Sequence, residues 1–204
     1  MKIDSYPKSQ LNLSDSEIQV LIGIILSDGT LQKRANTRFH FTQSDKHKEF
    51  FFMVYELFKK FCTDNLVSSP KTRTANNKSY LCYTFTTRQL PCFNLYYDLF
   101  YQSNIKVVPK NIDIYLTPLS LAFWIMGDGS KQNEGLHLNT YGFKLEDINI
   151  LVEALNKNFK INCTLHKHKT GMRIYISKND LLKIKPLIKP HMHSTMFYKL
   201  GIKE

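Results

Sequence analysis

The 204-residue sequence lacks most of the marks of a secreted, membrane-spanning or zinc-stabilised protein. Its cysteines, Cys62, Cys82, Cys92 and Cys163, form no CxxC pair, which argues against a disulfide framework or a zinc site. They are typical of ordinary thiols in a reducing compartment. No apolar run approaches the roughly 18 residues that a membrane-spanning helix needs, so we expect no membrane partner.

Targeting sequences are also missing from the start of the chain. The first ten residues have neither the apolar core of a signal peptide nor the Arg-rich amphipathic pattern of an import sequence. We therefore expect a cytosolic protein or one that is made inside its organelle. The abundance of Lys, Asn, Ile, Phe and Tyr is typical of an AT-rich genome and favours an organelle. The mitochondrial matrix is the expected compartment, with the chloroplast as the alternative.

Acidic residues are scarce, and some long segments contain none at all. The chain has 28 Lys and Arg against 17 Asp and Glu, which gives a formal net charge of +11. Residues 29–44, 65–97 and 154–179, which we expect to form hairpins, contain no acidic residue. A chain with this charge is expected to bind a polyanion. The charge alone would also fit a ribosomal or membrane-surface protein, but acid-free hairpins favour a nucleic acid.

One kind of apolar stretch occurs twice, as LIGIILSDG (21–29) and LAFWIMGDG (121–129). Each predicts a buried helix, and we expect its final glycine to end the helix by adopting a positive φ. Asp28 and Asp128 would then be buried at the negative end of a helix dipole, where ionisation is disfavoured. A bound divalent cation would remove both penalties. A core helix with an Asp-Gly turn would explain a single copy, but the repeat favours a paired site about a pseudo-twofold axis.

The same order of elements is predicted after each apolar stretch. In the first half, Ser14 and Glu17 form a capping-box pattern at the start of the motif helix. Hairpins are expected to turn at Ala35–Asn36 and Asn76–Asn77, and helices to cover residues 44–62 and 92–102.

The second half predicts a strand over residues 135–140, a helix over 145–159 and a hairpin that turns at Thr170–Gly171. A terminal helix should open near Asn179 and end in turns at Pro186 and Pro190. We predict an α+β protein with an N-terminal arm (1–13), a first half (14–105) and a second half (106–204). The halves would be pseudo-symmetric αββαββα units that form a saddle of antiparallel sheets.

Strand alternation separates a core face from a polar face in these hairpins. Phe39 and Phe41 share one face of their strand, whereas Arg38 and His40 share the other. A saddle with polar, basic faces could follow the major groove of DNA, with cations at phosphates and other side chains at base edges. Any one of these residues is more commonly a solvated surface residue, but as a set they are predicted DNA contacts. The set is Lys33, Arg34, Arg38, His40, Lys71, Arg73, Lys78, Thr84, Arg88, Lys131, His137, Asn139, Lys167, Arg173 and Tyr175.

Both apolar stretches resemble the LAGLIDADG motif of homing endonucleases. The matching residues are Leu21, Gly23, Ile25, Asp28 and Gly29 in the first copy, and Leu121, Ala122, Ile125, Asp128 and Gly129 in the second. The first acidic position of the motif is apolar here, at Leu26 and Met126. Phe123 replaces a motif glycine, and we expect Phe123 and Trp124 to pack in the core. The second half is also similar to a single-chain mitochondrial member of the family in YLTPLSLAFWIMGDG, LNTYGF, KIKPLIKP and MFYKL.

The resemblance implies a monomeric, site-specific endonuclease that cuts double-stranded DNA in intron homing. Such hydrolysis uses a divalent metal ion to activate water and to neutralise developing charge. The resemblance assigns catalysis to Asp28, Asp128, Lys106 and Lys199. Mg²⁺ or Mn²⁺ would be held by the carboxylates of Asp28 and Asp128 and by backbone carbonyls of Ser27 and Gly127.

Three alternatives remain open at this point. An RNA maturase would use the same fold to bind its host intron RNA, and a non-catalytic DNA-binding protein would use only the sheets. Two intact Asp-Gly tips favour a nuclease over both. The pairs His166–His168 and His191–His193 could begin a zinc site, but no third ligand is evident. We expect His166 and His168 to face DNA instead.

Overall fold

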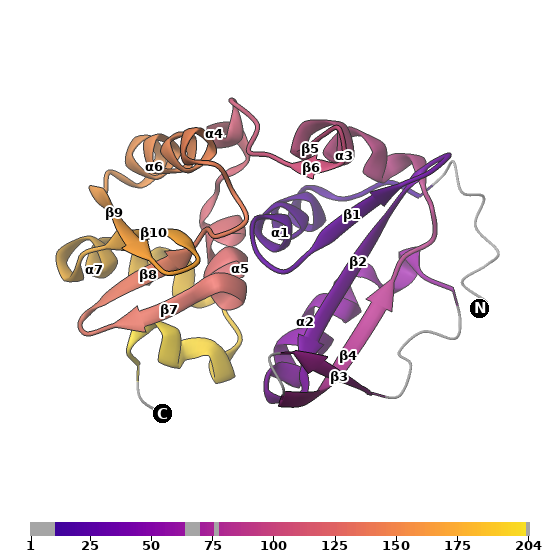
Figure 1. The fold of residues 1–204 in the computed structure, drawn as a ribbon, viewed down its shortest axis with the longest axis horizontal. Coiled ribbons are helices and arrows are strands. Elements are labelled where there is room, and N and C mark those ends of the chain that lie inside the picture. The colour runs from indigo at the N-terminus through magenta and orange to yellow at the C-terminus, as the bar shows by residue number, and fades with distance from the viewer. Residues whose placement is uncertain (1–10, 64–69, 76–77, 203–204) are drawn as a thin grey trace. The chain divides into compact units, whose positions relative to one another are not determined.

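The predicted order of elements is confirmed in both halves of the chain (Figure 1). The computed structural model describes residues 11–63, 70–75 and 78–202, so the predicted turn at Asn76–Asn77 lies outside the described residues. The first half comprises α1 (Asp15–Leu26), β1 (Thr30–Lys33), β2 (Thr37–Ser44), α2 (Lys48–Phe58), β3 (Lys71–Ala75), β4 (Lys78–Thr86) and α3 (Asn94–Phe100). The second comprises α5 (Pro118–Asp128), β7 (Gly129–Gln132), β8 (Gly135–Asn139), α6 (Leu145–Phe159), β9 (Cys163–His168), β10 (Gly171–Ile176) and α7 (Lys178–Ile188).

Shorter elements connect and extend these. They are the two-residue strands β5 (Tyr101–Gln102) and β6 (Ile105–Lys106), the helix α4 (Ile112–Tyr115) and the 3-10 helices η3 (Asp45–His47), η4 (Lys59–Phe61), η5 (Pro91–Phe93), η6 (Lys189–His191) and η7 (Ser194–Leu200).

The chain folds into two compact units whose membership does not follow chain order. One unit groups the residues up to Glu17 with Asp28–Tyr97, and the other groups Ile18–Ser27 with Asp98–Glu204. Most of α1 therefore packs with the second half of the sequence. The division of the sequence repeat at residue 105 stays a prediction.

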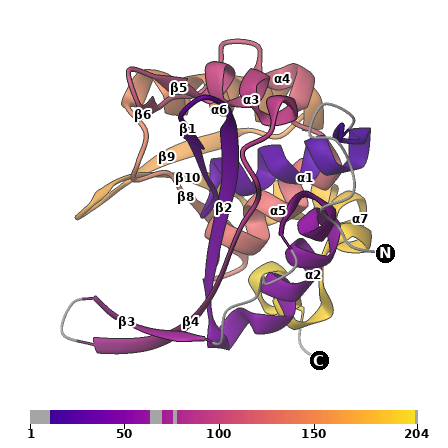
Figure 2. The ribbon, with the colours of Figure 1, turned by 90° about the vertical axis from the view of Figure 1, so that its right-hand side faces the viewer.

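In the first unit, an antiparallel sheet in the order β1-β2-β4-β3 is covered on one face by α2 (Figure 2). Phenylalanines from both layers interlock, with Phe39 and Phe41 of β2 against Phe58 and Phe51 of α2 at ring-centroid distances of 5.0 and 5.9 Å. Such pairs stabilise a core beyond the area that they bury. The core face predicted from strand alternation is therefore confirmed for β2.

The second unit repeats this arrangement with the order β7-β8-β10-β9. Leu136 and Leu138 of β8 and Ile174 and Ile176 of β10 are buried on the face that α6 and α7 cover. In the same unit α1 packs against α5 at Gly23, where an added Cβ would lie 2.2 Å from the carbonyl oxygen of Ser120. Gly23 is therefore required by close approach of two backbones, not by its own conformation.

Both motif helices begin with capping boxes. The amide of Ser14 donates to Glu17 Oε2 at 2.8 Å and the amide of Glu17 to Ser14 Oγ at 3.4 Å, which confirms the box predicted from the sequence. Thr117 and Ser120 form the corresponding box at the start of α5. The Thr117 hydroxyl also donates to Gln19 Oε1 at 2.6 Å, so the cap of α5 is tied to α1.

Two details of the prediction are wrong. Neither motif glycine has a positive φ, and Gly129 is extended with φ −70° and ψ 141°. A Cβ on Gly129 would lie 2.5 Å from the carbonyl oxygen of Ile125, so crowding by the last helical turn is the reason for glycine there. The terminal helix does not end at Pro186 but continues to Ile188. Pro186 has no N–H to donate to the carbonyl oxygen of Leu182, four residues earlier. Leu182 is exposed, so water can replace this one hydrogen bond and the helix is not forced to end.

Candidate functional site

The last three residues of each motif, 27–29 and 127–129, form what we call the two motif tips, and these differ in helical structure. Helix α1 ends at Leu26. The Ser27 hydroxyl donates a hydrogen bond to the carbonyl oxygen of Gly23 in the last turn of the helix, at 3.1 Å. Helix α5 continues through Asp128. The residues at the first acidic position of the motif, Leu26 and Met126, are both buried and belong to the core.

Neither aspartate is buried, which contradicts the prediction. Asp28 is exposed and Asp128 is half-buried. A buried carboxylate at the end of a helix would lose its hydration without gaining a charged partner, whereas these two remain accessible to a ligand. The tips therefore present carboxylates at the surface.

Gln43 is a site residue that the sequence analysis missed. Gln43 is the penultimate residue of β2, and its side-chain amide donates to Asp28 Oδ2, 15 residues earlier in the chain. Its position after the alternating polar residues of β2 was the only available signal. The contact gives the Asp28 carboxylate a neutral hydrogen-bond donor.

The two predicted catalytic lysines reach backbone carbonyls of the motif helices. Lys106 Nζ donates to the carbonyl oxygen of Ile25 at 2.9 Å. Lys199 is only 5% exposed, and its Nζ donates to the carbonyl oxygens of Met126 at 2.5 Å and Gly127 at 2.7 Å. Cations at the C-terminal ends of helices are favoured because the last carbonyls are otherwise unsatisfied.

The donors at the tips fit a hard divalent cation. Among the described side chains, no three His, Cys, Asp or Glu residues form a group that could hold a metal ion. The described residues therefore build no all-protein metal cage, and none of them forms such a group with His166 and His168. Mg²⁺ is commonly bound by one or two carboxylates together with waters and substrate phosphates. Asp28 and Asp128 are each accessible carboxylates of the kind that this mode of binding uses.

Side-chain hydrogen bonds cross the outer face of the first sheet, the face opposite α2. Each bond joins residues that are directly opposed on neighbouring strands. The bonds run from Arg38 Nε to Gln32 Oε1 at 2.9 Å, between His40 Nδ1 and Thr86 Oγ1 at 2.8 Å, and between Thr42 Oγ1 and Thr84 Oγ1 at 2.8 Å. These groups are half-buried and fixed in place, as a surface that reads hydrogen-bonding edges requires.

The outer face of the second sheet, opposite α6 and α7, carries packed rings. His166 stacks on Tyr175 with ring centroids 4.6 Å apart, and His137 Nε2 lies 3.0 Å from His166 Nδ1. His137 is on the predicted face but only 2% exposed, because these rings cover it. Burial and the positive charge of Arg173 lower the pKa of His137 to about 4. Asn139 is opposite Arg173 on the same face.

Four predicted DNA contacts lie away from these outer faces. Lys33 is in register with buried Thr37, and its ammonium lies 5.4 Å from the centre of the Tyr97 ring. Lys131 and Lys167 are in register with Leu136 and Met172, which puts them on the helix-covered side of their sheet.

Arg88 is the fourth predicted DNA contact that lies away from the outer faces. It follows β4, its Nε and Nη2 atoms are buried, and it lies close enough to the Cys62 thiol to act on it electrostatically. Burial nevertheless dominates and raises the pKa of Cys62 to about 12. Arg88 therefore faces the core side of the first unit.

The remaining predicted contacts lie in the β1–β2 turn and in β3 and β4. Arg34 is exposed in the turn between β1 and β2. Lys71 and Arg73 lie in β3, in register with Cys82 and Tyr80, and Lys78 begins β4. All of these assignments stay predictions.

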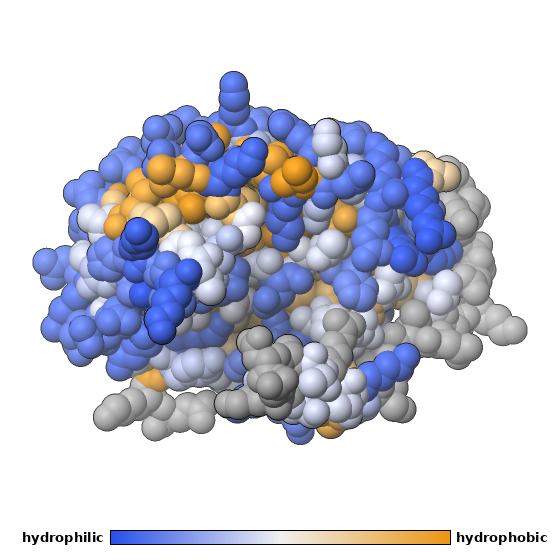
Figure 3. All heavy atoms as spheres, in the orientation of Figure 1, coloured by the Kyte–Doolittle hydropathy of each residue, from blue (hydrophilic) through white to orange (hydrophobic). Residues whose placement is uncertain are grey.

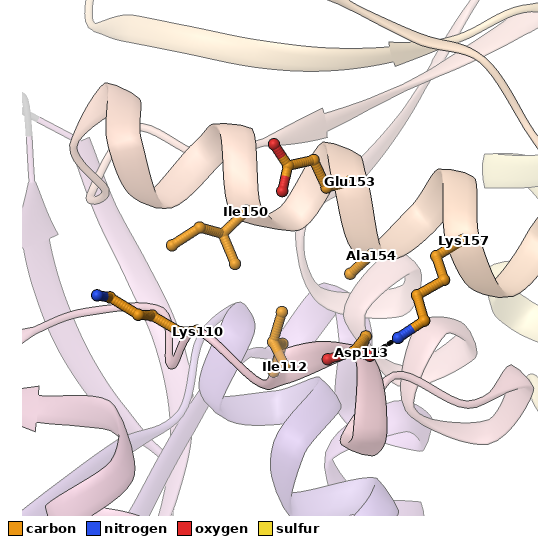
Figure 4. Close-up of a pocket in the computed structure, with 7 residues that line it drawn as sticks. All are labelled: Lys110, Ile112, Asp113, Ile150, Glu153, Ala154 and Lys157. Atoms are coloured by element: carbon orange, nitrogen blue, oxygen red, sulfur yellow. Dashed lines mark hydrogen bonds and ion pairs between the residues drawn. The ribbon is translucent and has the colours of Figure 1, made fainter.

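A separate cavity of about 420 Å³ lies between α4 and α6 (Figure 4). Its charged lining includes Asp113, which is hydrogen-bonded to Lys157, and this bond lowers the pKa of Asp113. Figure 3 shows apolar surface over the same helices, where Ile114 is 69% exposed. Its lining includes neither motif aspartate nor either of the lysines predicted to be catalytic.

Within the ranges that the structure describes, no helix combines the length and the apolar character needed to cross a bilayer.

Comparison with known proteins agrees with these observations. The LAGLIDADG DNA endonuclease family matches residues 18–184 of the chain. The chain is 36% identical over 159 residues to the intron-encoded endonuclease ai4 of Dictyostelium discoideum, covering 74% of this chain and 100% of that protein. It is 32% identical over 199 residues to the cytochrome b mRNA maturase bI2 of Debaryomyces hansenii, covering 93% of this chain and 75% of that protein. Its fold is similar to that of the homing endonuclease I-WcaI bound to its DNA recognition sequence, with a TM-score of 0.87, 26% identity and coverage of 99% and 93%.

Proposed function

The chain belongs to the LAGLIDADG DNA endonuclease family, and on that premise we propose that it is a site-specific endonuclease that cuts both strands of a long, asymmetric DNA site in intron homing. The observation that carries the proposal is the pair of helix tips that present Asp28 and Asp128 outside the core. A protein that only bound nucleic acid would have no use for two accessible carboxylates beside a polyanion, because they repel phosphates.

The residues at the tips suit metal-assisted hydrolysis. Asp28 and Asp128 would hold Mg²⁺ or Mn²⁺, which when bound activates water and neutralises charge on the phosphate. Gln43 keeps the Asp28 carboxylate in one orientation through its hydrogen bond. Lys106, half-buried and anchored on the carbonyl oxygen of Ile25, supplies a positive charge close to the first tip in the chain.

Binding would rest on the two outer faces. Arg38 and Arg173 supply cations for backbone phosphates, and the hydroxyl, amide and imidazole groups around them suit base edges. His40, Thr84, Asn139 and Tyr175 are the proposed contacts of the second kind. Because the residues of the two faces differ, the preferred target would be asymmetric, and one chain would suffice to bind it.

A maturase is the second candidate, favoured by the relative named cytochrome b mRNA maturase bI2. Host intron RNA would then be the partner. The names of two intron-encoded endonucleases among the relatives also support expression from an intron, and we propose an organelle, with the mitochondrial matrix ahead of the chloroplast.

One experiment separates these functions. The protein is incubated with Mg²⁺ and a randomised duplex library, and any cut ends are sequenced. We expect a single long consensus that is cut on both strands. Binding of a duplex consensus without cutting would favour a DNA-binding protein, and binding of intron RNA alone would favour a maturase.

A further inference from the structure

The two lysines that were predicted to be catalytic are not equivalent in this structure. Lys106 is half-buried and donates to one carbonyl oxygen, that of Ile25. Lys199 is almost fully buried and donates to two, those of Met126 and Gly127. In the motif repeat, Ile25 corresponds to Ile125, so the two ammonium groups bind different positions of their helices.

The 3-10 helix η7, which carries Lys199, is fixed on both sides of that residue. Met196 and Leu200 beside it are buried, and the backbone amide of His193 donates to Met126 Sδ at 3.3 Å. The ammonium of Lys199 thus replaces water as the partner of the last carbonyls of α5, at the negative end of the helix dipole. An ammonium has three N–H groups, and at least two of them are committed to backbone oxygens.

This geometry conflicts with Gly127 as a metal ligand. The carbonyl oxygen of Gly127 already lies 2.7 Å from a buried positive charge. A divalent cation on the same oxygen would be repelled by that charge with little water to screen it. Two of the three N–H groups of the ammonium are directed at backbone oxygens, so at most one remains for a reacting phosphate.

We infer that Lys199 is a positioning residue. Its hydrogen bonds fix the backbone at the end of α5 and thereby the position from which Asp128 would bind a metal ion. The same hydrogen bonds keep the Gly127 carbonyl oxygen from acting as a metal ligand. The first tip is held differently, by the Ser27 hydroxyl and the Gln43 amide. The inference rests on the proposed nuclease function, and it assigns Lys199 a different role from Lys106.

Two substitutions separate positioning from charge. Lys199→Gln keeps an N–H donor but removes the charge, whereas Lys199→Met removes both at similar length. Lys189→Met, at an exposed lysine of the neighbouring η6, is the matched control. Each protein is tested on the selected duplex with a different label on each strand, and its melting temperature without metal is recorded to confirm folding.

We expect Lys199→Met to slow cutting of one strand by roughly 10²-fold, as small displacements of catalytic groups do, and to lower the melting temperature. Lys199→Gln should stay within about tenfold of wild type, because one neutral hydrogen bond retains most of the contact. Equal losses in the two variants would overturn the inference, since charge would then matter and position would not.

Mn²⁺ affinity gives a readout that does not depend on cutting. In an Asp28→Asn background, Mn²⁺ titration of the protein–DNA complex followed by electron paramagnetic resonance reports the Asp128 tip. Lys199→Gln should bind Mn²⁺ several-fold more tightly, because the competing charge is gone. Unchanged or weaker binding would overturn the exclusion of Gly127. If the wild-type protein cuts no duplex, the proposed function fails, while the melting temperatures of the variants still test whether Lys199 holds the end of α5.

Discussion

Gly23 of α1 and Ser120 of α5 approach so closely that a Cβ atom on Gly23 would lie 2.2 Å from the carbonyl oxygen of Ser120. We expect Gly23→Ala to separate the two helices and to lower the free energy of unfolding by about 1–3 kcal/mol or more, as overpacking does. Gly142→Ala is the control, since an added Cβ there meets nothing within 4 Å. Urea unfolding of both variants measures the effect, and equal stability of the two would contradict the close packing.

Asp28→Asn and Asp128→Asn should each abolish double-strand cutting and leave specific binding largely intact. The amide is nearly isosteric with the carboxylate, but it lacks the charge that holds a divalent metal. Gel-shift and cleavage assays on the same duplex check this. Loss of specific binding would give the residue a structural role, and continued cutting of both strands would remove it from the nuclease site.

Arg38→Ala should weaken DNA binding and make it less dependent on salt. Each lost phosphate contact removes about 0.9 from the slope of log K against log salt. Lys33→Ala is the matched control, because Lys33 lies on the helix-covered side of the same sheet, near Tyr97. Fluorescence anisotropy from low to high salt measures both slopes. Similar losses in the two variants would argue against the outer face as the binding surface.

His137 should make stability depend on pH between about 4 and 6.5. Its pKa is lowered from 6.5 to about 4 in the folded protein, first by burial and then by Arg173, His166 and His168. Between these values the unfolded chain binds a proton that the folded protein does not. This contribution to stability is complete above pH 6.5 and is lost as the pH falls to 4.

The check is urea unfolding of wild type and His137→Gln across that range. The variant should show a shallower decline in the free energy of unfolding at low pH, because glutamine does not titrate. Parallel curves would mean that His137 takes up its proton as easily in the folded protein as in the unfolded chain.

The protein should bind DNA as a monomer. Both motif tips and both four-stranded sheets come from one chain, so a second copy is not needed to contact both strands. Analytical ultracentrifugation of the complex should give one chain per duplex. Two chains per duplex would refute this expectation.

The sequence determined the order of elements and the composition of their faces. Apolar residues at alternate strand positions put Phe39 and Phe41 in the core and Arg38 and His40 on the opposite face, because strand periodicity is local. The repeated apolar run with its Asp-Gly ending was enough to indicate the family. Capping at Ser14 was also readable, since it involves residues only three apart.

Only the tertiary structure decided what surrounds each site residue. Alternation alone puts Lys33 on the face of Leu31 and Lys167 on the face of Leu165, so the sequence could have separated them from Arg38 and Arg173. The strand of Lys131 contains no apolar side chain, so its face needed the register with β8, which the sequence does not show. Nor could it show that Gln43 contacts Asp28, or that Lys199 is buried against Gly127, because these pairs meet only after the chain folds. Periodicity reports the face of one element, whereas burial and charge at a site depend on elements distant in sequence.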